Sequence, residues 1–146
     1  MKLLLALAAA FTVGVLVTAA AGVPMRVHYI PQTTVSATMV KGGQIISDNG
    51  LIVLANRATA RGAERHGKTN HVFIIVDGEA TFVTGGTLMN PTDIGPDQTR
   101  GNGIAGGESH HLRKGDVITV PANTPHWWKD TSSTGSVGYY AVNIEQ

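Results

Sequence analysis

The stretch GDVITVPANTPHWW, residues 115–128, decides how the chain is expected to fold. Its Gly-Asp pair predicts a turn, and the apolar, largely β-branched run at 117–120 predicts a short strand. Because side chains two residues apart in a strand share a face, His126 and Trp128 are expected to point to the same side.

Short strand candidates, separated by Gly, Pro and Asn, occur through most of the remaining chain. They lie at residues 44–47, 51–56, 72–76, 80–84, 110–112, 117–120 and 137–144. Asp48-Asn49-Gly50 predicts a hairpin between the first two, and Asp77-Gly78 predicts a turn after which 80–84 pairs back. This pattern is typical of an all-β sandwich or barrel.

Two segments depart from the strand pattern. Thr33 or Thr34 can cap a helix that runs to about Lys41, where a Gly-Gly pair ends it. Residues 85–107 are rich in glycine and have no periodicity, which predicts a long functional or mobile loop. We therefore expect one short N-terminal helix before the strands and one long connection among them.

The first residues, MKLLLALAAAFTVGVLVTAAAG, have the order of a secretory signal peptide. One basic residue, Lys2, precedes an uncharged apolar run and a set of small residues that ends at Ala21. A retained membrane anchor and a cytosolic helix are the alternatives. Unless the Ala-rich end is counted, the run is shorter than the roughly 20 residues of a spanning helix. We predict a signal peptide at 1–21, a single domain at 22–146, and a secreted or periplasmic location.

Charge and cysteine content exclude several functions. Without Lys2, ten Lys and Arg residues balance ten Asp and Glu residues, and no stretch is strongly basic. We therefore expect no binding to nucleic acid and, after signal cleavage, none to a membrane. The chain has no cysteine, so thiolate sites and disulfides are excluded. An exported domain of this kind depends on its core, helped by a metal ion or a partner subunit.

Three of the six histidines are candidates for a metal site. His66 and His71 lie in GAERHGKTNHVFIIVDGEATF, residues 62–82, and His126 lies in the stretch quoted first. Strand alternation places His71 on the side of Phe73, which is expected to face the interior. Imidazoles converging in a barrel mouth would repel one another as cations, whereas a divalent metal binds them in neutral form. The alternative is that each is an ordinary hydrogen-bonded or surface histidine.

Glu64 lies two residues before His66 and therefore shares its face. It is a candidate fourth ligand, outer hydrogen-bond partner or catalytic proton carrier, and the alternative is a plain surface residue. His28, His110 and His111 are not expected to be ligands. The adjacent pair points to opposite faces, so one of the two could still line the pocket.

These segments resemble the two motifs of the cupin superfamily. In the second motif, Gly115-Asp116, Pro121 and His126 keep the family order. Asn123 stands where glycine is usual and tolerates the same left-handed conformation, so the resemblance implies that conformation here. The resemblance is to small, often exported bacterial members and runs from about residue 44 to the C-terminus. It implies an all-β cupin barrel, also called a double-stranded β-helix or jelly roll, with a short N-terminal helix.

The first motif departs from the common cupin form. Counting back from the turn glycine Gly78, His71 holds the position of the usual glutamate ligand. His66 matches the second histidine of the usual pair, and Glu64 falls where the first would be. The resemblance therefore implies the usual three histidines and one glutamate in a changed order, with His66, His71 and His126 binding one divalent metal per chain.

Three imidazole ligands leave coordination positions open, as in catalytic sites. The first hypothesis is an oxidative metalloenzyme, with copper favoured by the Irving–Williams order over iron, manganese or zinc. A weaker resemblance, to small exported copper cupins that cleave cellulose oxidatively, implies a carbohydrate or polysaccharide substrate. Glu64 would then be catalytic, and of Trp127 and Trp128 one would meet the substrate and one would close the core.

Two other functions are compatible with the same residues. One is a metal-dependent isomerase, hydrolase or dioxygenase on a small sugar or phenolic molecule, which a buried pocket would favour. The other is a non-catalytic extracytoplasmic binder of metal or a small ligand, which a fully occupied coordination sphere would favour. Cupins commonly pair through sheet edges and N-terminal strands, so the resemblance also implies a homodimer, with residues 27–30 in the contact.

Overall fold

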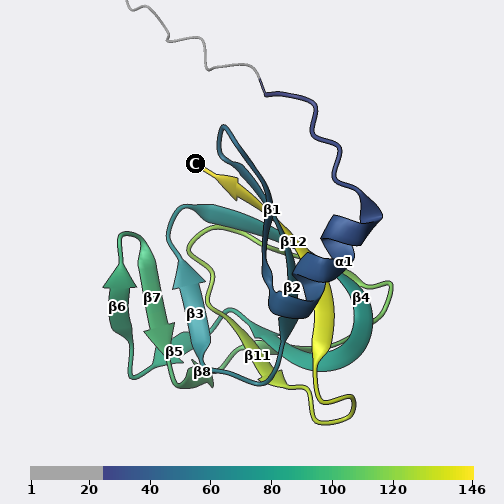
Figure 1. Cartoon of the computed structure of the whole chain (residues 1–146). Coiled ribbons are helices and arrows are strands. Elements are labelled where there is room, and N and C mark those ends of the chain that lie inside the picture. The colour runs from purple at the N-terminus through teal and green to yellow at the C-terminus, as the bar shows by residue number, and fades with distance from the viewer. Residues whose placement is uncertain (1–24) are drawn as a thin grey trace, which may run out of the picture.

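The computed structural model describes residues 25–146, so the predicted signal peptide at 1–21 lies outside the described residues. Within them, one helix precedes a series of short strands (Figure 1). The elements are α1 (Gln32–Lys41), β1 (Gly43–Asp48), β2 (Leu51–Ala58), β3 (Ala63–His66), β4 (Thr69–Thr84), β5 (Thr87–Met89), β6 (Thr92–Gly95), β7 (Gln98–Gly101), β8 (Gly103–Ala105), β9 (Glu108–Arg113), β10 (Val117–Val120), β11 (His126–Asp130) and β12 (Val137–Glu145). No helix in this part of the chain is long and apolar enough to cross a bilayer.

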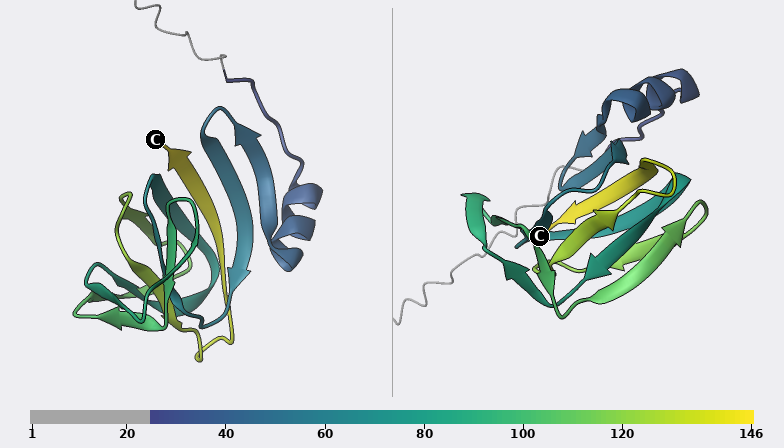
Figure 2. Two further views of the ribbon diagram at one scale, coloured as in Figure 1. Left: turned by 90° about the vertical axis from the view of Figure 1, so that its left-hand side faces the viewer. Right: turned by 90° about the horizontal axis from the view of Figure 1, so that it is seen from below.

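One long strand, β4, belongs to both halves of a curled antiparallel sheet. Its first half pairs with β12 on one side and β10 on the other. Its second half pairs with β11 and β9. The main path runs β1-β2-β12-β4-β11-β3-β7-β6, and it closes partway around an interior (Figure 2). The predicted hairpin between β1 and β2 is confirmed.

The predicted turn and back-pairing at Asp77-Gly78 are wrong. Gly78 does have the left-handed conformation of a turn glycine, with φ of 69°. A side chain there would meet the backbone oxygen of Ser136, so glycine is required. The strand nevertheless continues past Gly78, because each half finds its partners in strands far away in the sequence. The glycine marks a bend in β4 that lets one strand serve both halves of the sheet.

The prediction of a structureless loop at residues 85–107 is also wrong. This segment contains β5 to β8: β6 pairs with β7, β7 extends to β3, and β5 pairs with β8 as a separate two-stranded sheet. These strands have three or four residues each, and β6 is exposed throughout. Strands this short show no alternation of apolar and polar residues, which is why the sequence pattern missed them.

The helix α1 lies outside the curled sheet, against β1 and β2 (Figure 2). The predicted threonine caps are wrong, because the N-cap is Pro31 and no side chain caps the helix. Its end is as predicted: Gly42 has φ of 72° and donates its N–H to the carbonyl of Thr38 at 2.7 Å. No side chain of α1 is fully buried. The helix therefore contributes little to the core.

An aromatic core fills one end of the interior. Trp128 is 1% exposed and stacks on Tyr139 at a centroid distance of 4.8 Å, with Phe82 at 4.4 Å on another side. Phe73 packs against all three rings. Burying side chains of this size stabilises the fold by about 1.5–3 kcal/mol each. His71 stacks on Phe73 at a centroid distance of 5.4 Å, so the aromatic core packs directly against the histidines.

Candidate metal centre

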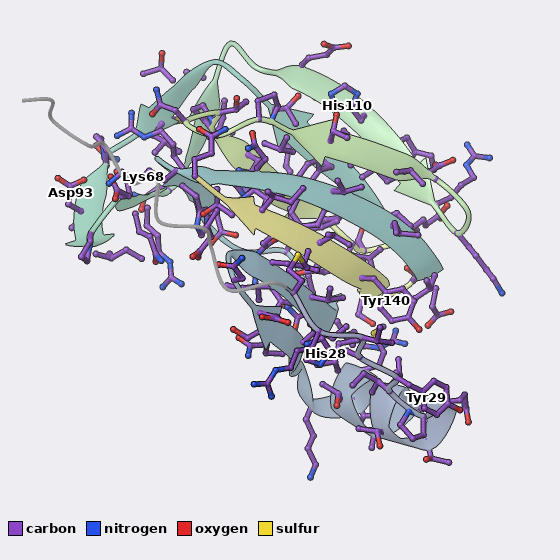
Figure 3. The ribbon with its side chains drawn as sticks, turned by 90° about the horizontal axis from the view of Figure 1, so that it is seen from above. His28, Tyr29, Lys68, Asp93, His110 and Tyr140 are labelled. Carbon is purple, nitrogen blue, oxygen red and sulfur yellow. The ribbon has the colours of Figure 1, made fainter. Side chains whose placement is uncertain are left out.

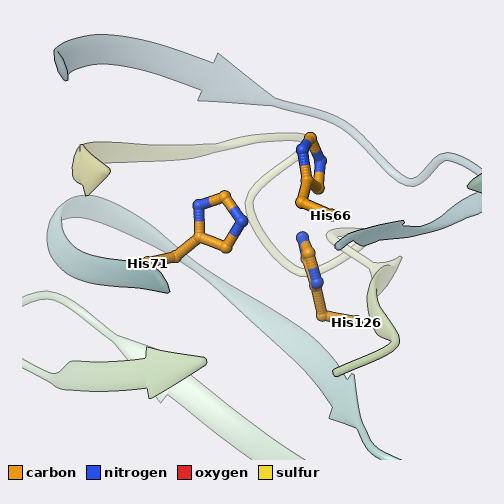
Figure 4. Close-up of side chains that lie close together, drawn as sticks. All are labelled: His66, His71 and His126. Carbon is orange, nitrogen blue, oxygen red and sulfur yellow. The ribbon is translucent and has the colours of Figure 1, made fainter. Parts of the chain in front are cut away.

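His66, His71 and His126 come together in the interior, each from a different strand. One ring nitrogen from each lies within 4.8 Å of the other two. Figure 4 shows the three rings turned toward one another, with His66 at the end of β3, His71 on β4 and His126 at the start of β11. The convergence predicted from strand alternation is therefore present.

Strand register brings these residues together. His126 lies opposite Glu64 of β3 on one side and Thr84 of β4 on the other. The turn before it is fastened to the same strand, since the Asn123 N–H donates to the His66 carbonyl at 2.7 Å. Asn123 has φ of 64°, the left-handed conformation predicted for it. The second motif thus sets the position of two of the three histidines.

Hydrogen bonds fix which nitrogen of two rings faces the interior. His71 Nδ1 lies 2.8 Å from Asn143 Oδ1, and His126 Nδ1 lies 3.1 Å from the Thr124 carbonyl. Both partners accept, so each Nδ1 carries the proton and each Nε2 is left with a lone pair. Both Nε2 atoms are buried and have no hydrogen-bond partner. Buried polar atoms are rarely left unpaired, so these lone pairs point to a missing positive partner.

The spacing suits one metal ion. Three atoms within 4.8 Å of one another surround a point about 2.8 Å or less from each, against about 2.1 Å for a metal–nitrogen bond. Closing this gap needs ring movements of less than about 1 Å, well within side-chain rotation. The donor set, the spacing and the unpaired lone pairs agree: the cluster can hold one divalent metal.

The electrostatics favour the neutral form in which imidazole binds metal. Burial lowers the pKa of His71 to about 4, an effect that the Asn143 hydrogen bond only partly offsets. Burial also lowers the pKa of His66, against the opposing influence of the Glu64 charge. Both rings are therefore neutral at pH 7, and no proton has to leave before a metal binds.

Glu64 lies beside the cluster. Its two carboxylate oxygens lie 3.7 Å from His126 Nε2 and 4.0 Å from His66 Nε2, and Arg61 bonds to it at 3.1 Å. Burial alone would raise its pKa, but the nearby His126 ring and the Arg61 charge hold that pKa at about 2. The side chain is only 19% exposed and lines the pocket. The alternative of a plain surface residue is wrong, and the roles of ligand, outer partner and proton carrier remain.

The cluster opens into a pocket of about 170 Å³. Its lining consists of Leu54, Asn56, Arg61, Glu64, His66, His71, Phe73, His126, Tyr139, Ala141 and Asn143. The sequence reasoning missed Asn56, Arg61 and Asn143. Two of them carried a signal: Asn143 continues the inward series of Tyr139 and Ala141 on β12, and Asn56 lies between inward apolar residues on β2. A polar residue in such a series indicates a lined cavity.

Neither tryptophan lines this pocket. Trp128 closes the core, as one of the two was expected to do. Trp127 is half-buried against a second apolar cluster, and its indole N–H donates to the Arg61 carbonyl. The expected contact between one of these tryptophans and a substrate is therefore not found in the pocket beside the histidine cluster.

The remaining histidines lie elsewhere in the described residues. His28 pairs with Asp48 at 2.9 Å, beside the N-terminal helix and far from His110 (Figure 3). His110 lies 2.9 Å from the Thr84 hydroxyl, and His111 pairs with Glu79 at 3.2 Å. None of them lines the pocket. The possibility that one of the adjacent pair lines the pocket is wrong, and none of the three belongs to the cluster of His66, His71 and His126.

Comparison with known proteins finds similarity in structure alone. No family model matches the sequence, and no curated protein does. An Fe(II) structure of HppE is 17% identical, with a TM-score of 0.51, over 70% of this chain and 50% of its own. Hydroxypropylphosphonic acid epoxidase from S. wedmorenis, in complex with fosfomycin, is 18% identical, with a TM-score of 0.50, over 73% and 53%.

A third similar structure is an uncharacterised conserved protein with a double-stranded β-helix domain from Klebsiella pneumoniae. It is 14% identical, with a TM-score of 0.50, over 70% of this chain and 69% of its own. The present chain spans about half the length of the first two proteins. At these identities the likeness concerns the fold. The chain thus has the mostly antiparallel, double-stranded β-helix fold of the cupins, preceded by one short helix.

Proposed function

We propose that this protein is a mononuclear metalloenzyme of oxidative chemistry that acts on a small molecule. The observation that carries the proposal is the pair of buried, unpartnered Nε2 atoms of His71 and His126, with His66 completing a cluster within 4.8 Å. His66, His71 and His126 would hold the metal. A metal held by three imidazoles keeps open positions, at which it supplies a Lewis acid and a binding place for O₂ or substrate.

Copper is the metal that we propose first. An all-imidazole site follows the Irving–Williams order, which places Cu(II) above the other divalent first-row metals. Iron is the second candidate, because it is the metal in the similar Fe(II) structure of HppE. Manganese and zinc also accept imidazole, and they would support the isomerase or hydrolase alternative.

The surrounding residues would act on the substrate. Glu64 is ionised and within 4.0 Å of two cluster nitrogens, so its carboxylate can bind the metal or accept a hydrogen bond from a substrate bound there. Leu54, Phe73 and Ala141 line the pocket with apolar surface and limit the access of water. Phe73 also holds the His71 ring by stacking.

The pocket favours a small substrate over a polysaccharide. Its volume of about 170 Å³ is below the roughly 300–1,000 Å³ of pockets that enclose drug-sized ligands. Both tryptophans lie outside it, so the tryptophan surface expected to meet a sugar chain is absent from the described lining. We therefore rank a small-molecule substrate above cellulose or another polysaccharide.

A non-catalytic metal store is less well supported. That function predicted a coordination sphere filled by protein, with Glu64 and one of the His110-His111 pair as further ligands. Neither member of that pair lines the pocket, so the described lining offers at most four protein ligands, and a five- or six-coordinate metal would keep a position open to substrate even with Glu64 bound.

The test combines metal preference with oxygen consumption. The protein is refolded without metal, offered equal Cu(II), Fe(II), Mn(II) and Zn(II), and analysed for bound metal. The copper form should give an EPR spectrum with several nitrogen ligands and should consume O₂ with a reductant, and His66→Ala should lose both properties. Retention of zinc alone, without O₂ consumption, would contradict the oxidative proposal.

We also propose that the mature protein is exported and forms a homodimer. The lead-in before α1 exposes Val27 and Tyr29 at 99% and 84%, and β1 is an edge strand of the sheet. An exposed apolar arm beside a free edge is suited to a second copy of the chain. Light scattering at micromolar concentration checks the dimer, and a monomer would contradict it. The N-terminal residue of the exported protein checks cleavage after Ala21.

A further inference from the structure

Hydrogen-bond donors gather on one wall of the pocket. The Tyr139 hydroxyl lies near the side chains of Asn56 and Arg61. All three side chains line the pocket, and Tyr139 is 3% exposed. They come from β2, β12 and the link between β2 and β3, so the cluster is built by the fold and does not depend on one loop.

The two asparagines of the lining turn their donors to the pocket. Asn56 Oδ1 accepts the N–H of Gly43 at 2.8 Å, so the Asn56 amide NH₂ is the group of this side chain that can donate to the pocket. Asn143 Oδ1 lies 2.8 Å from His71 Nδ1, so its NH₂ can donate in the same way. Glu64 is the single acidic residue in the described lining. The wall is therefore complementary to a ligand rich in acceptor oxygens.

Glu64 lies between the Arg61 guanidinium and the His126 ring. Arg61 Nη2 bonds to its Oε1 at 3.1 Å, and the same oxygen is 3.7 Å from His126 Nε2. A divalent ion at the histidines would attract this carboxylate more strongly than a guanidinium that is 46% exposed. Arg61 would then lose its partner and face the pocket, and the pocket would gain positive charge.

We propose that the pocket binds a small molecule that carries a carboxylate, and that metal binding at the histidines makes Arg61 available to hold that carboxylate. This inference rests on the proposed function. In the metal-free protein the Arg61 guanidinium is hydrogen-bonded to the Glu64 carboxylate. When Glu64 turns to the metal, Arg61 is free to bind the substrate carboxylate in the two-bond arrangement that guanidinium favours, with Asn56 and Tyr139 as further donors. The rest of the substrate lies toward the histidines.

This arrangement couples two binding events. Because metal and carboxylate both act on the pairing of Arg61 with Glu64, each raises the affinity of the protein for the other. A mutation that removes the Glu64 charge should release the Arg61 guanidinium, as metal binding is proposed to do. Metal-free Glu64→Gln should therefore bind a carboxylate more tightly than metal-free wild type, a result that direct binding of the carboxylate to a metal cannot produce.

The test is an NMR titration of the full chain with propionate, a weak chelator, with propionamide as the neutral control. Zn(II) serves as a redox-inert metal. We expect propionate to bind about tenfold more tightly to metal-free Glu64→Gln than to metal-free wild type, and about tenfold more weakly to zinc-loaded Arg61→Met than to zinc-loaded wild type. Arg61→Lys should recover part of the loss, and propionamide should not bind comparably.

The backbone contacts of Arg61 are independent of its side chain: its N–H donates to the Trp128 carbonyl, and its carbonyl accepts from Trp127. Arg61→Met should therefore fold. Arg65→Met is the matched control, since Arg65 bonds to Thr99 away from this pocket.

Equal propionate affinity in zinc-loaded wild type and Arg61→Met would overturn the inference. If wild type bound no metal, the proposed function would fail, and the metal-free comparison of Glu64→Gln with Glu64→Gln/Arg61→Met would still decide whether Arg61 holds the carboxylate.

Discussion

Asn143 of β12 lies directly opposite His71 of β4 in the sheet, and its side-chain oxygen lies 2.8 Å from His71 Nδ1. This single contact sets the tautomer and the direction of a ring that is 5% exposed. Outer partners of this kind orient metal-binding histidines and increase their basicity. Asn143 therefore belongs to the candidate metal centre as the outer partner of His71.

Replacing Asn143 with leucine should weaken metal binding by about 10–100-fold, because the His71 ring would lose its fixed proton position. Asn143→Asp keeps an acceptor oxygen and should retain affinity close to that of wild type. Competition with a chromogenic chelator measures both. If Asn143→Leu bound metal as tightly as Asn143→Asp, the outer contact would have no part in the site.

The metal-free protein should lose stability between about pH 6.5 and pH 4. The pKa of His71 falls from 6.5 to about 4 on folding, so the unfolded chain binds a proton in this range and the folded chain does not. Stability is therefore complete above the unfolded pKa and falls as the pH is lowered, by about 3 kcal/mol for a change of this size. Urea unfolding in the presence of a chelator checks this, and His71→Leu should have a much flatter profile. A wild-type curve as flat as that of the variant would contradict the assignment.

Trp128→Ala should destabilise the fold by about 3–5 kcal/mol, because it removes a ring that is 1% exposed and in contact with Phe73, Phe82 and Tyr139. Trp127→Ala should cost less, since this ring is only half-buried. Chemical denaturation measures both. Equal and small effects would mean that Trp128 is not part of the core.

Asn123 tests the turn that places His126. Its φ of 64° is tolerated by asparagine and glycine but costs a β-branched residue about 1–2 kcal/mol. Asn123→Gly should therefore leave stability and metal affinity nearly unchanged, whereas Asn123→Val should lower both. Thermal unfolding with and without metal compares the two variants. A stable Asn123→Val protein with full metal affinity would show that the turn conformation is not needed.

The part of the site that could be predicted is the part that lies in continuous motifs. Period-two alternation placed His71 and His126 inward, and the left-handed Asn123 followed from the tolerance of asparagine. Both depend on neighbours in sequence. Asn143 could not be placed in the same way, because its role arises from the pairing of β12 with β4, two strands that lie far apart in the chain. Arg61 lies in the link between β2 and β3, where no strand alternation indicates the direction of a side chain, although its partner Glu64 is only three residues away.

The errors have the same physical origin. Asp77-Gly78 has the local chemistry of a hairpin turn, yet tertiary pairing of each half of β4 with other strands keeps the strand continuous. Residues 85–107 form strands too short and too exposed to show a period. For α1, Pro31 supplies the carbonyl for the first helical N–H groups, so no threonine cap is needed.

The central claim is that His66, His71 and His126 bind one metal ion. The most direct test is metal content after copper loading and desalting, compared among wild type, His126→Ala and His28→Ala. His126 is 1% exposed within the cluster, whereas His28 pairs with Asp48 outside it. We predict one copper per chain in wild type and His28→Ala, and almost none in His126→Ala. No copper in wild type, or equal copper in the two variants, would contradict the assignment of the metal centre.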